Sequence, residues 1–179
     1  MKAVDKILGE AMTPQQKRIY KDPEKSVFHA RANNTRFPEA EPYISKDPTW
    51  AYRYTRDILV KRWPEAEPHI LNSPEYAYYY ARDIIKGRWP EAEPTVAKDH
   101  RWSYRYIRDV LRKRWPDGEA AIATDGHCAY KYVVNFIHGR WPEGEEAISK
   151  SFHKDDYLHR FPDAAEDWAM NGWIDWLDT

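Results

Sequence analysis

Arginine and tyrosine side chains recur at a fixed spacing through the middle of the sequence, and both residue types are suited to binding. Arg56, Arg82 and Arg108 are each followed by an aspartate, and Arg53 and Arg105 lie one helical turn before two of them. The accompanying tyrosines are Tyr52, Tyr78 and Tyr104. Arginine and tyrosine are enriched among the residues that dominate protein interfaces, and the same pair can stack bases and hold phosphates. The column predicts a binding site across residues 53–109; the alternative is a solvated face with the tyrosines packed between layers.

The C-terminal end carries a second candidate surface, in which tryptophans are interleaved with acidic side chains. Residues 161–179 contain no lysine or arginine. The tryptophans are Trp168, Trp173 and Trp176. One interpretation is a capping helix that closes the last apolar face of a repeat array. The other is a docking segment for a basic groove on a partner protein.

The sequence does not contain a recognisable pattern for metal binding or catalysis. Its seven histidines show no metal-ligand spacing. Cys128 occupies a repeat position that is elsewhere filled by Trp50, Tyr76 and Trp102, which favours a packing role. A nucleophile elbow, a phosphate-binding glycine loop and a zinc-protease motif are all missing. We therefore expect no enzyme, no cofactor and no bound metal.

The arginines belong to a longer repeat with a period of 26 residues. Its clearest copies, with the sequence R-W-P-E-A-E-P, are Arg62–Pro68 and Arg88–Pro94. Related blocks begin at Arg36, Arg114 and Arg140. A fixed period of this length indicates a repeat architecture. The arginine that opens each block is predicted to pair with a glutamate of the short helix that follows it; the alternative is that these arginines form a track that binds anions.

Each repeat predicts one short and one long helix. Pro64 opens a short acidic helix of about two turns, because proline and glutamate suit the first turn of a helix. Asp47 or Ser73 caps a longer helix, which is predicted to continue to the arginine of the next block, as at Arg62. Small, medium and large apolar side chains at helical spacing give each long helix a stripe that must be buried.

One short and one long helix cannot bury this stripe alone, whereas a stack of them can. The sequence therefore predicts an all-α fold, an α-solenoid of short two-helix repeats with capping helices at both ends. The N-terminal capping helix is predicted over residues 1–12, the repeat array over 13–160, and an acidic, Trp-rich cap over 161–179.

Bulk properties narrow the class of protein. The chain has 179 residues and a formal net charge of −1, so no global field would by itself hold DNA or an anionic membrane. Cys128 is the single cysteine, which fits a reducing compartment. The sequence lacks a bilayer-spanning apolar run and the apolar core of a secretory signal. We expect a soluble, cytoplasmic protein with no membrane partner.

The block Arg62–Pro68, joined to the pattern D-P-x-W-A-Y-x-Y-x-R-D-I of residues 47–58, resembles tandem helical repeats in uncharacterised bacteriophage proteins. The resemblance covers roughly residues 14–160. It implies an all-α array and a phage origin. It supplies no catalytic residues.

The expected function is therefore binding without catalysis, most directly of a protein. The resemblance suggests, by analogy with other small phage proteins, that the chain is a phage-encoded inhibitor that occludes a host or defence protein. Two alternatives stay open. One is a nucleic-acid or nucleotide binder that uses the same arginines and tyrosines, and the other is a structural or self-associating phage protein.

Overall fold

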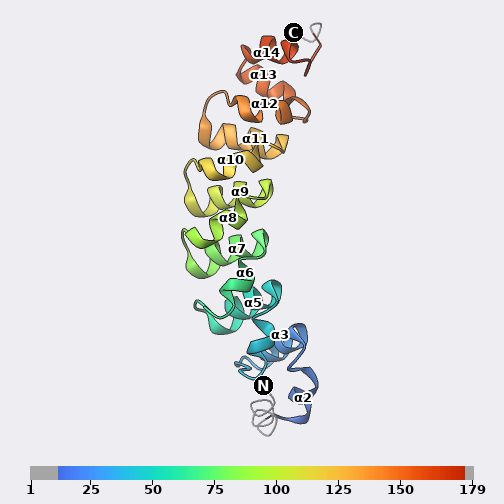
Figure 1. Cartoon of the computed structure of the whole chain (residues 1–179), viewed down its shortest axis with the longest axis vertical. Coiled ribbons are helices and arrows are strands. Elements are labelled where there is room, and N and C mark those ends of the chain that lie inside the picture. Colours follow the sequence, from blue (N-terminus) through green and yellow to red (C-terminus); the bar gives the residue numbers. More distant parts are fainter. Residues whose placement is uncertain (1–11, 176–179) are drawn as a thin grey trace. The chain divides into compact units, whose positions relative to one another are not determined.

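The computed structural model describes residues 12–175, and every regular element in this part of the chain is a helix (Figure 1). The all-α class predicted from the sequence is confirmed. None of the helices within residues 12–175 combines the length and the apolar composition needed to cross a bilayer. The capping helix predicted over residues 1–12 lies, apart from Met12, outside the described residues, as does Trp176.

The chain forms two compact units, residues 1–89 and 90–179, and each is considered by itself. The described helices of the first unit follow one another in chain order, and each packs on its neighbours. They are α2 (Pro14–Ile19), α3 (Pro23–Ala32), α4 (Glu41–Ile44), α5 (Pro48–Tyr54), η1 (Thr55–Leu59), α6 (Glu67–Ile70), α7 (Pro74–Tyr80) and η2 (Ala81–Ile85).

The second unit continues the same alternation of short and long helices. Its elements are η3 (Pro90–Ala92), α8 (Glu93–Val96), α9 (His100–Tyr106), η4 (Ile107–Leu111), α10 (Pro116–Ile122), α11 (Gly126–Tyr132), η5 (Val133–Ile137), α12 (Pro142–Ser149), α13 (Lys154–Arg160) and α14 (Ala164–Met170). Within this unit α9 packs against α10 and α11, and α11 packs against α12.

The long helices begin where their caps predict but end earlier than expected. The Asp47 carboxylate accepts hydrogen bonds from the backbone N–H groups of Thr49 and Trp50, which a helix leaves free at its start. The last turn widens into a π-helix, and the helix stops at Leu59 instead of continuing to Arg62. The equivalent ends are Ile85, Leu111 and Ile137.

A left-handed residue causes this early stop. Val60 has φ 52°, and its N–H donates to the carbonyl of Thr55, which closes the wide turn. The equivalent residues are Lys86, Arg112 and His138. Three of these residues, valine, lysine and arginine, belong to types that rarely adopt positive φ, so the residue pattern did not reveal the turn.

The short helices are also shorter than predicted in the first unit. The expected start was Pro64, but α6 begins at Glu67. Pro68 has no N–H with which to bond the carbonyl one turn before it, so the first turn cannot be α-helical. The same holds for α8 in the second unit, which contains Pro94 and begins at Glu93. In α10 the equivalent residue is Ala120, which has the N–H that the first turn needs, and the helix begins at Pro116.

The Arg-Trp-Pro-Glu block forms a hydrogen-bonded joint between the long helices. Arg62 Nε and Nη2 donate to the two carboxylate oxygens of Glu67 at 2.8 and 2.7 Å. The buried hydroxyl of Tyr80 accepts from Trp63 N–H at 2.6 Å and donates to Glu67 at 3.1 Å. Burial raises the pKa of Tyr80, so the hydroxyl keeps the proton it donates. The predicted arginine–glutamate pair is thus present, within a larger network.

The same joint recurs at other copies of the block. The arginine–glutamate pairs are Arg36–Glu41, Arg114–Glu119 and Arg140–Glu145. The corresponding tyrosine hydroxyls, which bond both the aromatic residue's N–H and the glutamate, are those of Tyr54, Tyr132 and Tyr157. Because these groups satisfy one another, the conspicuous block is structural.

Candidate functional site

The arginine column of the first unit is neutralised by its own neighbours. Arg56 holds Asp57 in a fork, with Nε–Oδ1 and Nη2–Oδ2 distances of 2.7 and 3.1 Å. Asp57 also pairs with Arg31 at 3.0 Å. Arg82 forms the same fork with Asp83 at 2.6 and 2.8 Å. Arg56 and Arg82 are thus each paired with the aspartate that follows them, and Asp57 is shared with a second arginine.

The three tyrosines of the predicted site are buried. Tyr52, Tyr78 and Tyr104 are 5, 1 and 7% exposed. Tyr52 donates its hydroxyl proton to Asp83 at 2.5 Å, and burial together with this bond raises its pKa to about 12. These side chains therefore do not fit the expected role of surface anchors, because their rings are already packed. The alternative of tyrosines between layers describes them better.

The equivalent contact persists in the second unit although the charge is lost. Asn135 stands where the earlier copies have aspartate, and its amide donates to the Tyr104 hydroxyl at 3.1 Å. A partner 31 residues away thus holds Tyr104 as Asp83 holds Tyr52. The column therefore serves packing through the repeats, and the fourth copy keeps the contact without the ion pair.

Arg53 and Arg105, the remaining predicted arginines, lie over tryptophan rings. The guanidinium carbon of Arg53 is 4.7 Å from the ring centre of Trp50, and that of Arg105 is 4.8 Å from Trp102. Both arginines lack an ion pair with any carboxylate in residues 12–175. A stacked guanidinium keeps its N–H groups at the ring edge, where they can still donate to a ligand.

The second unit gathers such cations around a cavity of about 320 Å³ between α9 and α11. We call Arg101, Arg105, Arg108 and Lys131, which all line it, the basic cluster. Arg108 forks Asp109 at 2.7 Å through both nitrogens, as in the first unit. The other three have no ion pair within residues 12–175. The cavity also contains His100, Tyr104, Asp125, His127 and Cys128.

The basic cluster arises where one repeat departs from the preceding one. In α7 the positions equivalent to Arg101 and Arg105 are Glu75 and Tyr79. The helix caps and the π-helical turn are the same in both helices, so the side chains project from equivalent backbone positions. Two substitutions therefore turn an acidic or neutral helix start into a cationic one.

The surroundings of Asp125 in the cavity favour its ionised form, which lies among the cations. Burial raises the pKa of Asp125, but hydrogen bonding by Cys128 and the charges of His100 and His127 together outweigh burial, so the net pKa lies below the ordinary value. Burial lowers the pKa of His127, and Lys131 and His153 lower it further. With one carboxylate against three unpaired cations, the cavity has a net positive charge suited to an anionic group.

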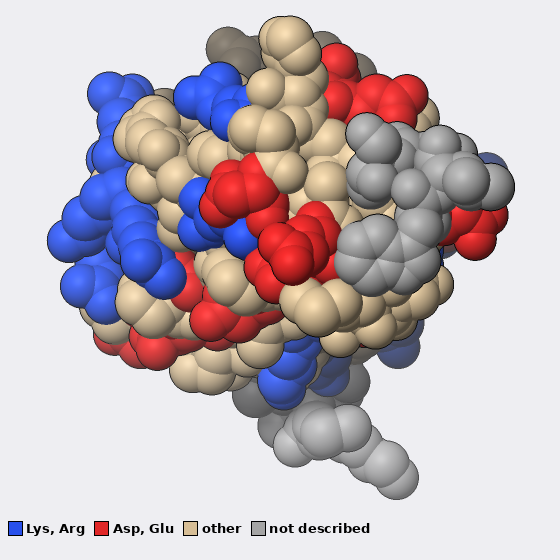
Figure 2. Space-filling model, turned by 90° about the horizontal axis from the view of Figure 1, so that it is seen from above, with Lys and Arg blue, Asp and Glu red and all other residues tan. Residues whose placement is uncertain are grey.

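Charge is segregated on the surface as well. Figure 2 shows Lys and Arg side chains gathered most densely along one edge of the face drawn, while Asp and Glu side chains lie near its middle and at other parts of its rim. The contacts above show that many charges in the described residues are nonetheless paired. Exposed pairs of this kind contribute little to stability.

The C-terminal tryptophans are divided between the core and the surface. Trp168 on α14 is buried, and its Nε1–H donates to the buried Glu145 at 2.9 Å. Arg140, which forks Glu145, also reaches Asp163 and Asp167. Trp173 is half-buried against Trp168, with ring centres 6.4 Å apart. The contacts of Trp168 are those of a cap, and its burial does not fit the docking segment.

The sequence pattern missed the proximity of His100, Asp125 and Cys128. One ligand atom from each lies within 4.8 Å of the others. The available signal was the period itself, since residues about 26 positions apart at the starts of successive long helices become neighbours.

No family model matches this sequence, and the searches of curated proteins and of solved structures found no match.

Proposed function

We propose that the chain is a non-catalytic binding protein, an α-solenoid of two-helix repeats, whose basic cluster binds an acidic segment of a partner protein. One observation carries this proposal: Arg101, Arg105 and Lys131 line one cavity and lack a carboxylate partner within residues 12–175. Clustered unpaired cations cost stability through repulsion, so a fold that keeps them gains most when an anion binds.

The chemistry of the cluster favours carboxylates. A guanidinium can hold a carboxylate through two parallel hydrogen bonds, and two arginines in one cavity can hold two acidic side chains. Complementary charge also speeds encounter and makes it sensitive to salt. The resemblance to bacteriophage repeat proteins makes a host or defence protein the proposed target, which the bound chain would occlude.

A charge-reversed variant, Arg101→Glu/Arg105→Glu/Lys131→Glu, tests the proposal. Its matched control is Lys17→Glu/Lys46→Glu/Lys98→Glu, which makes the same change in net charge at exposed lysines outside the cavity. We expect a fluorescent glutamate-rich peptide to bind wild type and control alike, with affinity falling as salt rises. The cluster variant should lose binding, and equal binding by all three proteins would refute the proposed site.

Nucleic acid is the second candidate, favoured by the same unpaired cations. The buried tyrosines argue against it, because single-strand binders need open aromatic faces for base stacking. Titration with a short single-stranded oligonucleotide separates the two. If the oligonucleotide binds more tightly than the peptide, with a steep salt dependence, nucleic acid rather than an acidic protein segment is the partner. Self-association is tested by light scattering, where the mass of one chain would exclude it.

A further inference from the structure

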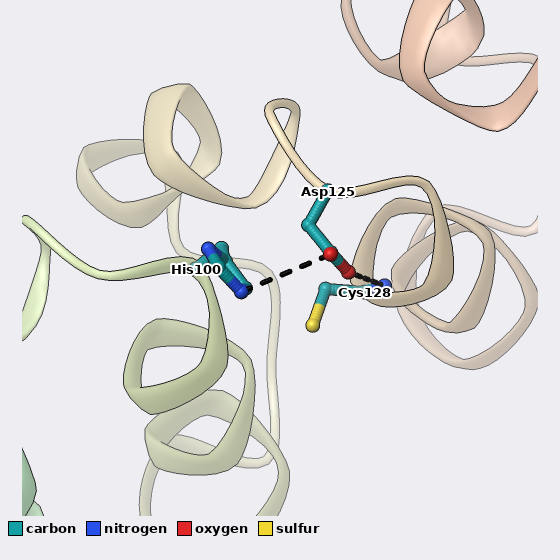
Figure 3. A group of neighbouring side chains, drawn as sticks. All are labelled: His100, Asp125 and Cys128. Carbon is teal, nitrogen blue, oxygen red and sulfur yellow. Dashed lines mark hydrogen bonds and ion pairs between the residues drawn. The ribbon is translucent and has the colours of Figure 1, made fainter. Parts of the chain in front are cut away.

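We propose that His100, Asp125 and Cys128 form a binding site for a zinc-like transition-metal ion in the cavity of the second unit. The three residues come from the starts of two neighbouring long helices: His100 opens α9, Asp125 is the N-cap of α11, and Cys128 lies in the first turn of α11. Figure 3 shows the imidazole, the carboxylate and the thiol turned toward one another. A thiolate, an imidazole and a carboxylate are the three ligand types that zinc takes in proteins.

Each of the three side chains can offer a lone pair to a metal ion. Asp125 Oδ1 accepts from Cys128 N–H at 2.8 Å, which fixes the carboxylate plane. Its Oδ2 faces His100 Nε2 at 3.8 Å, too far for a hydrogen bond but suited to a shared cation. A zinc ion at about 2.0–2.3 Å from each ligand would bring these atoms closer together than they are now. Their present separations, all within 4.8 Å, require only small side-chain movements.

Charge balance allows the site despite the surrounding arginines. A dication with one thiolate, one carboxylate and a neutral imidazole has zero net charge, so its ligands neutralise it; uptake of the ion with loss of one thiol proton adds one positive charge to the cavity. Because zinc binds the thiolate, metal binding must release the Cys128 thiol proton to solvent.

The site does not follow from the packing rule of the repeat. His100 stands where earlier copies have Pro48 and Pro74, and Cys128 stands where they have large aromatic residues. Only the capping aspartate recurs. The second unit thus has a histidine and a cysteine beside a capping aspartate, a combination that the clear copies in the first unit lack.

Three protein ligands leave one tetrahedral position open. Because all three residues line the cavity, water or an anionic group can occupy that position. Metal binding does not depend on the proposed partner, and it is measured without one.

Titration of the metal-free full chain with Co²⁺ tests the site. We expect a thiolate-to-cobalt charge-transfer band in the near ultraviolet and visible ligand-field bands, both displaced by Zn²⁺. Cys128→Ser should abolish the charge-transfer band. His100→Asn and Asp125→Asn should each weaken binding by about 10-fold or more. Asparagine retains the helix cap, so Asp125→Asn tests the charge without removing the cap.

His69→Asn, on α6 in the first unit, is the matched control and should bind as wild type does. Circular dichroism checks that every variant is folded. The absence of a thiolate band in wild type would overturn the site, as would unchanged affinity in both asparagine variants. The peptide titration of the basic cluster, repeated with chelator present, tests the proposed function separately.

Discussion

The long helices α7 and α9 have the same backbone design and opposite uses of charge. Each is capped by a side-chain oxygen, widens into a π-helical turn and ends at a left-handed residue. In α7 the first turn carries Glu75, and Arg82 is forked to Asp83. In α9 the fork recurs as Arg108–Asp109, but Arg101 and Arg105 are added without carboxylate partners.

The difference separates two kinds of cation. Cations at repeated positions form ion pairs with a carboxylate of the same chain. Cations at variable positions line the cavity and have no ion pair with a carboxylate in the described residues. Removal of the first kind should cost stability, whereas removal of the second should cost binding alone. The predictions below test this division, beginning with the largest expected effect.

Glu145→Ala should be the most damaging change. The carboxylate is buried and accepts from Arg140, Tyr157 and Trp168. Its loss leaves buried donors without an acceptor, and we expect the free energy of unfolding to fall by about 3–5 kcal/mol. Urea denaturation measures it. Glu143→Ala, at an exposed position of the same helix, should change stability by less than about 0.5 kcal/mol; equal losses would show that the joint is not structural.

Gly118→Ala should also destabilise, although alanine occupies the equivalent position in the first unit. A Cβ at Gly118 would lie 2.5 Å from the ring of Trp115. Overpacking of this kind costs about 1–3 kcal/mol, more than alanine gains in a helix. Gly139→Ala, where nothing lies within 4 Å, is the control. Thermal unfolding of both variants checks the prediction, and an unchanged Tm for Gly118→Ala would contradict it.

Neutralisation of the two kinds of cation compares them directly. Arg82→Gln breaks the fork with Asp83 and the bond to Tyr78, and we expect a loss of about 0.2–1 kcal/mol for this half-exposed pair. Arg101→Gln/Arg105→Gln/Lys131→Gln removes three charges but no ion pair. The triple variant should be as stable as wild type or slightly more stable in urea. A larger loss of unfolding free energy in the triple variant than in Arg82→Gln would contradict the division into stabilising and binding cations.

The smallest effect concerns pH. Burial, Lys131 and His153 lower the pKa of His127 below its ordinary value of about 6.5, while Asp125 opposes them. The unfolded chain therefore takes up the proton first as pH falls. This contribution to stability is complete above about pH 6.5 and declines below it. Urea midpoints measured from pH 8 to 5 should show the decline, and His127→Gln should flatten it. Lys131→Gln should reduce it.

The helical class and the helix starts were readable from the residues, because caps and apolar spacing act locally. Asp47, Ser73 and Asp99 begin helices as their types predict. The helix ends were misjudged, because Val60 and its equivalents adopt positive φ, which their residue types do not announce. The candidate site was only partly predictable. Arg105 and Arg108, two arginines of the predicted column, line the cavity, whereas the burial of Tyr104 depends on neighbours distant in sequence.

By itself, the sequence determined the repeat period, the alternation of short and long helices and the joint built on Arg62, Trp63 and Glu67. These features depend on spacing and on contacts within a few residues, which the chain order already contains. Only the tertiary structure decided which charges are neutralised and that His100, Asp125 and Cys128 meet. Pairing and burial depend on which side chains successive helices bring together. Whether two side chains form a hydrogen bond depends on differences of a few tenths of an ångström in their separation, and the repeat period does not specify distances that finely.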